Sequence, residues 1–83
     1  MELLNREERT VSLDSGVANL GTGAIRIEMC EGTAWIGYKN EDIVLREGET
    51  IRLGASHNPV VISSTNEDQN IKFKVKHVNP LWG

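Results

Sequence analysis

The fold is indicated most clearly by the stretch Ala24-Ile25-Arg26-Ile27-Glu28-Met29-Cys30. Its isoleucines and its methionine fall on alternate positions, with the charged Arg26 and Glu28 between them. Successive side chains of a β-strand point to opposite faces, so this period of two predicts a strand with one buried face. The stretch Ile71 to Lys76 has the same alternation, with a lysine at every second position. We therefore expect a fold built from half-buried strands.

Other β-prone runs lie on both sides of this stretch and are separated by turn residues. No segment of the body has the period of an amphipathic helix, and strands spaced by roughly 8 to 12 residues are typical of small sandwiches and barrels. The sequence therefore predicts an all-β fold, either a small antiparallel sandwich or a half barrel of about 7–8 short strands. The further runs are Thr10–Leu13, Thr33–Tyr38, Asp42–Arg46, Thr50–Gly54 and Val60–Ser64.

Three finer expectations follow from local pattern. Glu31-Gly32 has the composition of a tight turn, so the strands on its two sides should pair as an antiparallel hairpin. The continuous β-branched run Val60–Ser64 suits a central strand that is covered on both faces. Lysines at 72, 74 and 76 on the last strand are expected to protect an exposed sheet edge against aggregation.

The chain length of 83 residues predicts one domain. We expect a flexible or short helical segment over 1–9, a single β-domain over 10–79 and a C-terminal tail over 80–83. A chain of this size buries only about 60% of its unfolded surface, and Cys30 is the only cysteine, so no intrachain disulfide adds stability. Self-association is therefore the expected supplement.

Charge and hydropathy exclude several classes of protein. The formal net charge of −3 disfavours a general nucleic-acid binder, which needs Lys and Arg to displace counterions. No apolar run approaches the roughly 20 residues that span a membrane, and the charged start lacks the apolar stretch of a signal peptide. These features predict a cytoplasmic protein without membrane contact, and the single cysteine fits a reducing compartment.

Few residues here have catalytic or metal-binding potential. His57 and His77 are the only histidines, and a zinc site usually requires three or four protein ligands, so we predict no metal site, no cofactor and no catalytic set. His57 is expected in a loop, with a role in a pocket as the alternative. His77 continues the apolar face of the last strand and is expected in the core or an interface. Cys30 is expected to be an unreactive residue at a strand end.

The remaining candidates are basic and aromatic. One face of the last strand is formed by Lys72, Lys74 and Lys76, and Arg26 and Arg52 are candidates to extend this basic face. A nucleic-acid strand is the alternative partner of the face. Trp35 is expected to anchor packing, and Trp82 in the tail is expected to dock on a neighbouring subunit. The candidate ligand-binding residues are Trp35, Tyr38 and His57. The candidate interface residues are His77, Leu81 and Trp82.

A resemblance to a known family covers roughly Ala24 to Ser64. The runs Gly32-Thr33-Ala34-Trp35-Ile36 and Asp42 to Leu53, with Leu45-Arg46-Glu47-Gly48-Glu49 at the centre, resemble the bacterial family called domain of unknown function 2917. That family commonly has threonine after its Trp-Ile pair, where Gly37 stands in this chain. A kink or bulge is therefore expected at Gly37.

The Leu-x-x-Gly-Glu pattern is also similar to the second half of a cupin barrel, which implies a cupin-like half barrel. Cupin enzymes take their metal from a His-x-His pair, a glutamate and a further histidine, and the stretch Tyr38 to Asp42 has no histidine. The resemblance therefore implies no metal-dependent cupin chemistry. A weaker similarity to the ring-forming trp RNA-binding attenuation protein, through positions 23–27 and 32–36, is compatible with a multimer.

These observations lead to two hypotheses about function. The first is a non-enzymatic cupin-like module that self-associates and binds a small ligand or a protein partner. The second is a small cupin-like enzyme that uses His57 or His77 beside a carboxylate in a pocket. A minor alternative is binding of single-stranded nucleic acid along the face of Lys72, Lys74 and Lys76.

Overall fold

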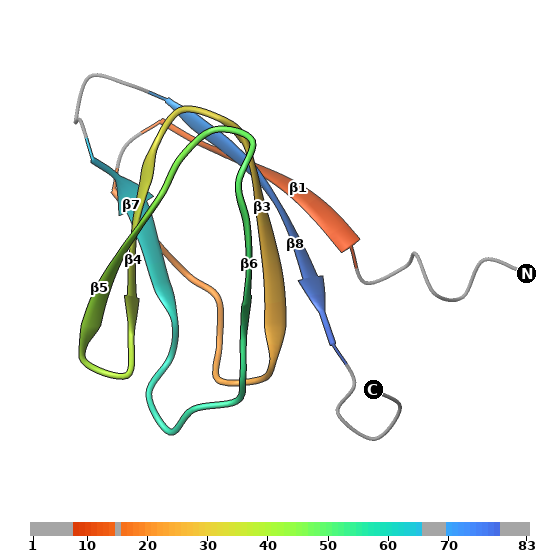
Figure 1. Cartoon of the computed structure of the whole chain (residues 1–83), viewed down its shortest axis with the longest axis vertical. Coiled ribbons are helices and arrows are strands. Elements are labelled where there is room, and N and C mark those ends of the chain that lie inside the picture. Colours follow the sequence, from red (N-terminus) through yellow and green to blue (C-terminus); the bar gives the residue numbers. More distant parts are fainter. Residues whose placement is uncertain (1–7, 15, 66–69, 79–83) are drawn as a thin grey trace, which may run out of the picture.

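The computed structural model describes residues 8–14, 16–65 and 70–78, and these form eight strands in two antiparallel sheets (Figure 1). Sheet A has the order β1-β8-β3-β6, and sheet B has the order β2-β7-β4-β5. The all-β prediction, with its antiparallel sheets and short strands, is confirmed. The strands are β1 Glu8–Leu13, β2 Val17–Asn19, β3 Ile25–Glu31, β4 Ala34–Tyr38, β5 Glu41–Leu45, β6 Thr50–Leu53, β7 Val61–Ser64 and β8 Ile71–His77.

The core lies between the two sheets, where each strand directs its alternate apolar residues. In sheet A, β3 from Ile25 to Met29 and β8 from Ile71 to Val75 have the alternating burial that their sequences predict. Phe73 is fully buried and lies opposite Met29 on β3 and Val11 on β1. The largest fully buried side chains are Ile25, Ile27, Met29, Ile36, Val60, Ile62, Ile71, Phe73 and Val75.

The predicted hairpin between β3 and β4 is wrong, because the two strands belong to different sheets. β3 pairs with β6 and β8, whereas β4 pairs with β5 and β7. The register of β3 shifts between Met29 and Glu31, and such a bulge re-aims a strand. Gly32 then turns with φ of 82° against β8, where an added Cβ would lie 2.9 Å from Ile71 Cγ2 and 3.0 Å from the Asn70 carbonyl oxygen. This turn carries the chain from sheet A to sheet B.

A true hairpin connects β4 to β5. Tyr38 pairs with Glu41, and the two intervening residues, Lys39 and Asn40, have φ of 51° and 64°. Positive φ at both central positions is the conformation of the two-residue hairpin turn that matches strand twist. The polar turn predicted at this place is therefore confirmed.

Other expectations require correction. β7 lies inside sheet B, but only Ile62 among its residues is buried, so the strand is covered on one face rather than two. β8 lies between β1 and β3 and is not an edge strand. The short strand β2 was not predicted, since three residues between turns give no readable period. β1 begins at Glu8, inside the segment expected to be flexible or helical, and the rest of that segment and the tail 80–83 lie outside the described residues.

Candidate functional site

The space between the sheets is filled with apolar side chains and offers no ligands to a metal. None of the buried side chains in the described part of the chain is polar or charged. The described residues also contain no group of three or more His, Cys, Asp and Glu placed to hold a metal ion. A cupin-type metal needs imidazole and carboxylate donors directed into this space. The described residues do not fit such a metal.

The turn between β4 and β5 and the loop between β6 and β7 border an open hollow of about 540 Å³ at one end of the molecule. His57 lies in its wall, together with Lys39 and Ser56. No carboxylate lines this hollow among the described residues, so it lacks the acid–base partner that the enzyme hypothesis requires beside His57. The complete lining is Lys39, Asn40, Ala55, Ser56, His57 and Asn58.

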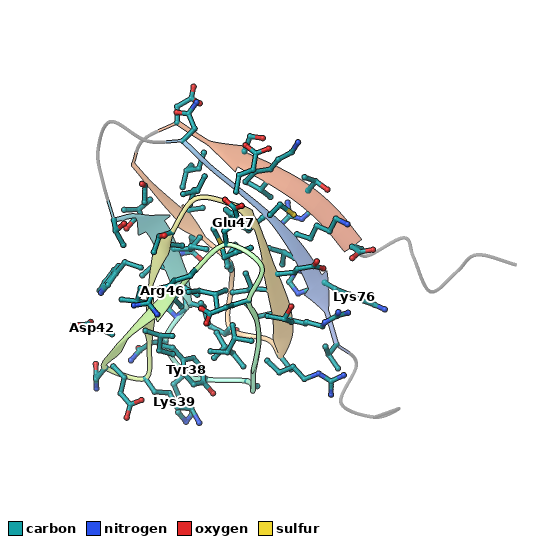
Figure 2. All side chains as sticks on the ribbon, turned by 45° about the horizontal axis from the view of Figure 1, so that its top comes forward. Tyr38, Lys39, Asp42, Arg46, Glu47 and Lys76 are labelled. Carbon is teal, nitrogen blue, oxygen red and sulfur yellow. The ribbon has the colours of Figure 1, made fainter. Side chains whose placement is uncertain are left out.

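A smaller hollow of about 280 Å³ adjoins the first and shares Lys39, Asn40 and Asn58 with it. Trp35 and Tyr38 contribute to its lining. The Tyr38 hydroxyl donates a hydrogen bond of 3.2 Å to the Gly54 carbonyl, which ties β4 to the end of β6. Lys39 Nζ lies 5.3 Å from the centre of the Tyr38 ring, and Figure 2 shows both side chains at this end of the molecule.

The structure thus gathers the three candidate ligand-binding residues around two adjacent hollows. Trp35, Tyr38 and His57 come from two segments that are far apart in the sequence. Sequence reasoning missed Lys39 and Asn58, which lie at the boundary of both hollows. The turn signals around these two residues marked them as loop positions, but only the packing of one loop against another could mark them as neighbours.

The outer face of sheet B carries a row of mostly apolar residues across all four strands. In register, Val17 lies opposite Ser63, Ser63 opposite Trp35, and Trp35 opposite Val44. Val17 is 63% exposed and Val44 is 51% exposed, whereas Trp35 is half-buried. We call these four residues the apolar row. Trp35 is expected to anchor packing, and its side chain lies on the outer surface of sheet B and not in the core between the sheets.

Gly37 makes room for the Trp35 ring. An added Cβ on Gly37 would lie 3.2 Å from Trp35 Cη2 and 3.0 Å from Val61 Cγ2. Gly37 pairs regularly with Asp42 and Val61, so the kink or bulge expected at this position is wrong. The irregularity occurs instead at Met29–Glu31 on β3. The glycine therefore lets the indole lie along the sheet surface.

The outer face of sheet A is polar and contains a second row. Arg26 lies opposite Lys76 on one side and opposite Arg52 on the other. We call these three residues the cation row. The explanation of the lysines as protection of a sheet edge is wrong, because β8 is an interior strand. The sequence indicated the five basic residues of this face, but strand order and register were needed to align three of them.

Two further candidate residues, His77 and Cys30, do not line either hollow. His77 is exposed at the end of β8, opposite Ile25, so the expectation of a core position is wrong. Cys30 is half-buried at the β3 bulge, where its Sγ lies 3.9 Å from the Glu28 carbonyl oxygen. Leu81 and Trp82 lie outside the described residues. No helix in the described part of the chain is long and apolar enough to cross a membrane.

Solved structures with a similar arrangement of strands are known. No protein-family model and no curated protein matches the sequence. A de novo designed double-stranded β-helix is 21% identical with a TM-score of 0.62, over 86% of this chain and 97% of the design. A cupin protein from Bacteroides fragilis is 19% identical with a TM-score of 0.67, over 88% of this chain and 64% of that protein. The fold is a cupin-like double-stranded β-helix.

The cupin-like fold also occurs in part of a regulator. The Cupin_2 domain of an XRE family transcriptional regulator from Enterobacter cloacae is 14% identical with a TM-score of 0.67, over 95% of this chain and 87% of that domain. At such identities the similarity concerns the fold, which confirms the predicted cupin-like half barrel. The described strands hydrogen-bond as two separate sheets and do not form one closed barrel. The resemblance to domain of unknown function 2917 and the cytoplasmic location stay predictions.

Proposed function

We propose that this chain is a non-enzymatic cupin-like module that self-associates through the outer face of sheet B. The observation that carries the proposal is the apolar row, in which Trp35 lies beside the exposed Val44 and is separated from the exposed Val17 by Ser63. Isolated exposed valines are ordinary on protein surfaces, but adjacent apolar residues around an aromatic are typical of interaction sites. The row contains no charged residue.

A second copy of the chain is the partner that suits this row. A two-fold axis near Trp35 would place Val17 of one copy against Val44 of the other, so the same patch serves both copies. Face-to-face packing of two sheets is a common way to cover such a surface. Because the chain has a net charge of −3, two copies repel each other, and salt should strengthen the association by screening.

The size of the face predicts weak association. Four strands about 4.8 Å apart, each three to five residues long at about 3.3 Å per residue, make a face of roughly 15 by 15 Å. Its area of roughly 200 Å² is well below the surface of about 800 Å² per partner in a standard interface. We therefore expect a dissociation constant on the order of 10–100 μM from this face alone. Leu81 and Trp82 in the tail, together with His77, are proposed to add contacts.

The test is the mass of the full chain by light scattering over a concentration series. We expect a shift from monomer towards dimer as the concentration rises through about 100 μM. Val44→Lys should keep the chain monomeric because it buries an ammonium group within the contact. Thr10→Lys is the control, since it adds the same charge at an exposed residue of β1, on the outer face of sheet A. A monomer throughout, or equal effects of the two variants, would refute the proposal.

The larger hollow at the β4–β5 turn favours a second activity, binding of a small anion, whereas the smaller hollow is also lined by Glu41 and Asp42. The larger hollow is lined by Lys39, His57, Ser56 and two asparagine side chains, all of which can donate hydrogen bonds. The test is a titration of the protein with acetate, citrate or inorganic phosphate. Binding is followed through the backbone amide NMR signals of the protein. Shifts at residues 39–40 and 55–58 would support the assignment. No shift at millimolar anion, or shifts confined to other residues, would contradict it.

A further inference from the structure

We propose that the outer face of sheet A binds the phosphate backbone of a nucleic-acid strand through the cation row, Lys76, Arg26 and Arg52. This inference concerns the opposite sheet from the apolar row and does not depend on self-association. Figure 2 shows Lys76 on the other side of the molecule from Asp42 of sheet B.

The register places three positive charges side by side at sheet spacing. Arg26 is paired with Lys76 and with Arg52, so its directly opposite neighbours on both sides are cations. Adjacent strands lie about 4.8 Å apart, so the row spans roughly 10 Å in a nearly straight line. Like charges directly opposite each other destabilise a sheet. A local arrangement that costs stability without an evident gain in folding points to a functional role.

The carboxylates of this face leave the middle of the row uncompensated within the register. Glu8 lies opposite Lys76 at one end of the row, and Glu28 lies opposite Lys74 in the next row. Glu31 lies opposite Lys72, beyond the bulge. Neither arginine has a carboxylate directly opposite it. Arg52 is exposed on the edge strand β6, and Arg26 is half-buried between its neighbours.

The shape and composition of the face favour an extended anion over other negatively charged partners. The crevice lined by Glu8, Arg26, Glu28, Lys74 and Lys76 has no room for a small molecule. Thr10, Ser12 and Thr50 complete the face, so it has no large apolar side chain to insert into a lipid surface. Among the described residues, this face also has no aromatic ring on which a base could stack. The contacts would therefore be made to the backbone and would not depend on base sequence.

The experiment is a fluorescence anisotropy titration of the full chain with a labelled oligothymidine of about a dozen nucleotides. Three phosphate contacts to a single strand predict a slope of about −2 in log affinity against log salt, which is roughly a twentyfold loss between 50 and 200 mM. Arg52→Gln should reduce the steepness by about 0.7, and Arg26→Gln should do the same. Glu28→Gln should tighten binding.

The control is Arg46→Gln, which makes the same change at an exposed arginine after β5, outside the cation row. It should leave both affinity and slope unchanged. Three outcomes would overturn the inference: no binding at 50 mM salt, equal weakening by Arg46→Gln and Arg52→Gln, or inorganic tripolyphosphate competing as well as oligothymidine at equal phosphate concentration. The last result would indicate a site for compact anions. Circular dichroism of each variant excludes unfolding as the cause of lost binding.

Discussion

The two sheets of this molecule have nearly equivalent inner faces and very different outer faces. Inside, both sheets present aliphatic side chains with Phe73 among them. Outside, sheet B presents the apolar row, with Trp35 between Ser63 and the exposed Val44, whereas sheet A presents Arg26 between two further cations. Burial of the inner faces explains the fold, because both sheets need a common apolar layer. The outer faces are not required for that layer, so their difference is where function is to be sought.

The largest effect expected from this comparison separates the inner face from the outer. Phe73→Ala should lower the free energy of unfolding by about 3–5 kcal/mol, because it leaves a cavity in the shared core. Trp35→Ala removes a larger side chain but should cost only about 1 kcal/mol, since the ring is half-buried outside sheet B. Urea denaturation measures both. Equal losses would mean that Trp35 belongs energetically to the core.

The next largest loss of stability is expected from a change at Gly32, in the connection between the two sheets. Gly32→Ala should cost about 2–4 kcal/mol, because it combines a positive φ with a clash against Asn70 and Ile71. Gly48→Ala is the matched control, with φ of 87° and open space around an added Cβ. It should cost only about 1 kcal/mol. If thermal and urea unfolding give the same loss of stability for the two variants, packing of Gly32 against β8 does not stabilise the connection between the sheets.

A smaller change sharpens the description of the outer face of sheet B. Gly37→Thr should displace the Trp35 ring and lower stability by about 1 kcal/mol, because the new side chain overlaps Trp35 and Val61. In a Trp82→Phe background, Trp35 is the only tryptophan, so its emission reports the displacement. Self-association should weaken in parallel. Unchanged emission would show that Gly37 does not position the ring.

The smallest expected effect concerns the outer face of sheet A. Arg26→Glu turns three neighbouring cations into an alternating row and should raise stability by about 0.2–1 kcal/mol. The same variant should abolish oligonucleotide binding at low salt. Urea denaturation measures the gain in stability, and fluorescence anisotropy measures the loss of oligonucleotide binding. A variant that is both less stable and unable to bind would indicate that Arg26 has a structural role instead.

Sequence reasoning succeeded where one local pattern decided the structure, and it failed where distant segments had to be placed. The alternation in Ala24–Cys30 and in Ile71–Lys76 correctly predicted the buried faces of β3 and β8. The same pattern could not distinguish a hairpin at Gly32 from a crossing between sheets, because the Asn70 and Ile71 contacts that decide it lie far along the chain.

The candidate site shows the same division. Trp35, Tyr38 and His57 were identified by residue type, but their meeting around two hollows depends on the loop between β6 and β7. Arg26 and Arg52 were identified as possible additions to the lysine face. Their alignment with Lys76 depends on a strand order that a single sequence does not reveal.

The most direct test of the proposed self-association is a dilution series of amide NMR spectra of the full chain, from about 1 mM to about 10 μM. The proposal predicts that concentration-dependent shifts gather on β2, β4, β5 and β7, around Trp35 and Val44, with a further shift at His77, while β1, β6 and the rest of β8 stay unchanged. Spectra that do not change with concentration, or shifts that gather on sheet A, would contradict it.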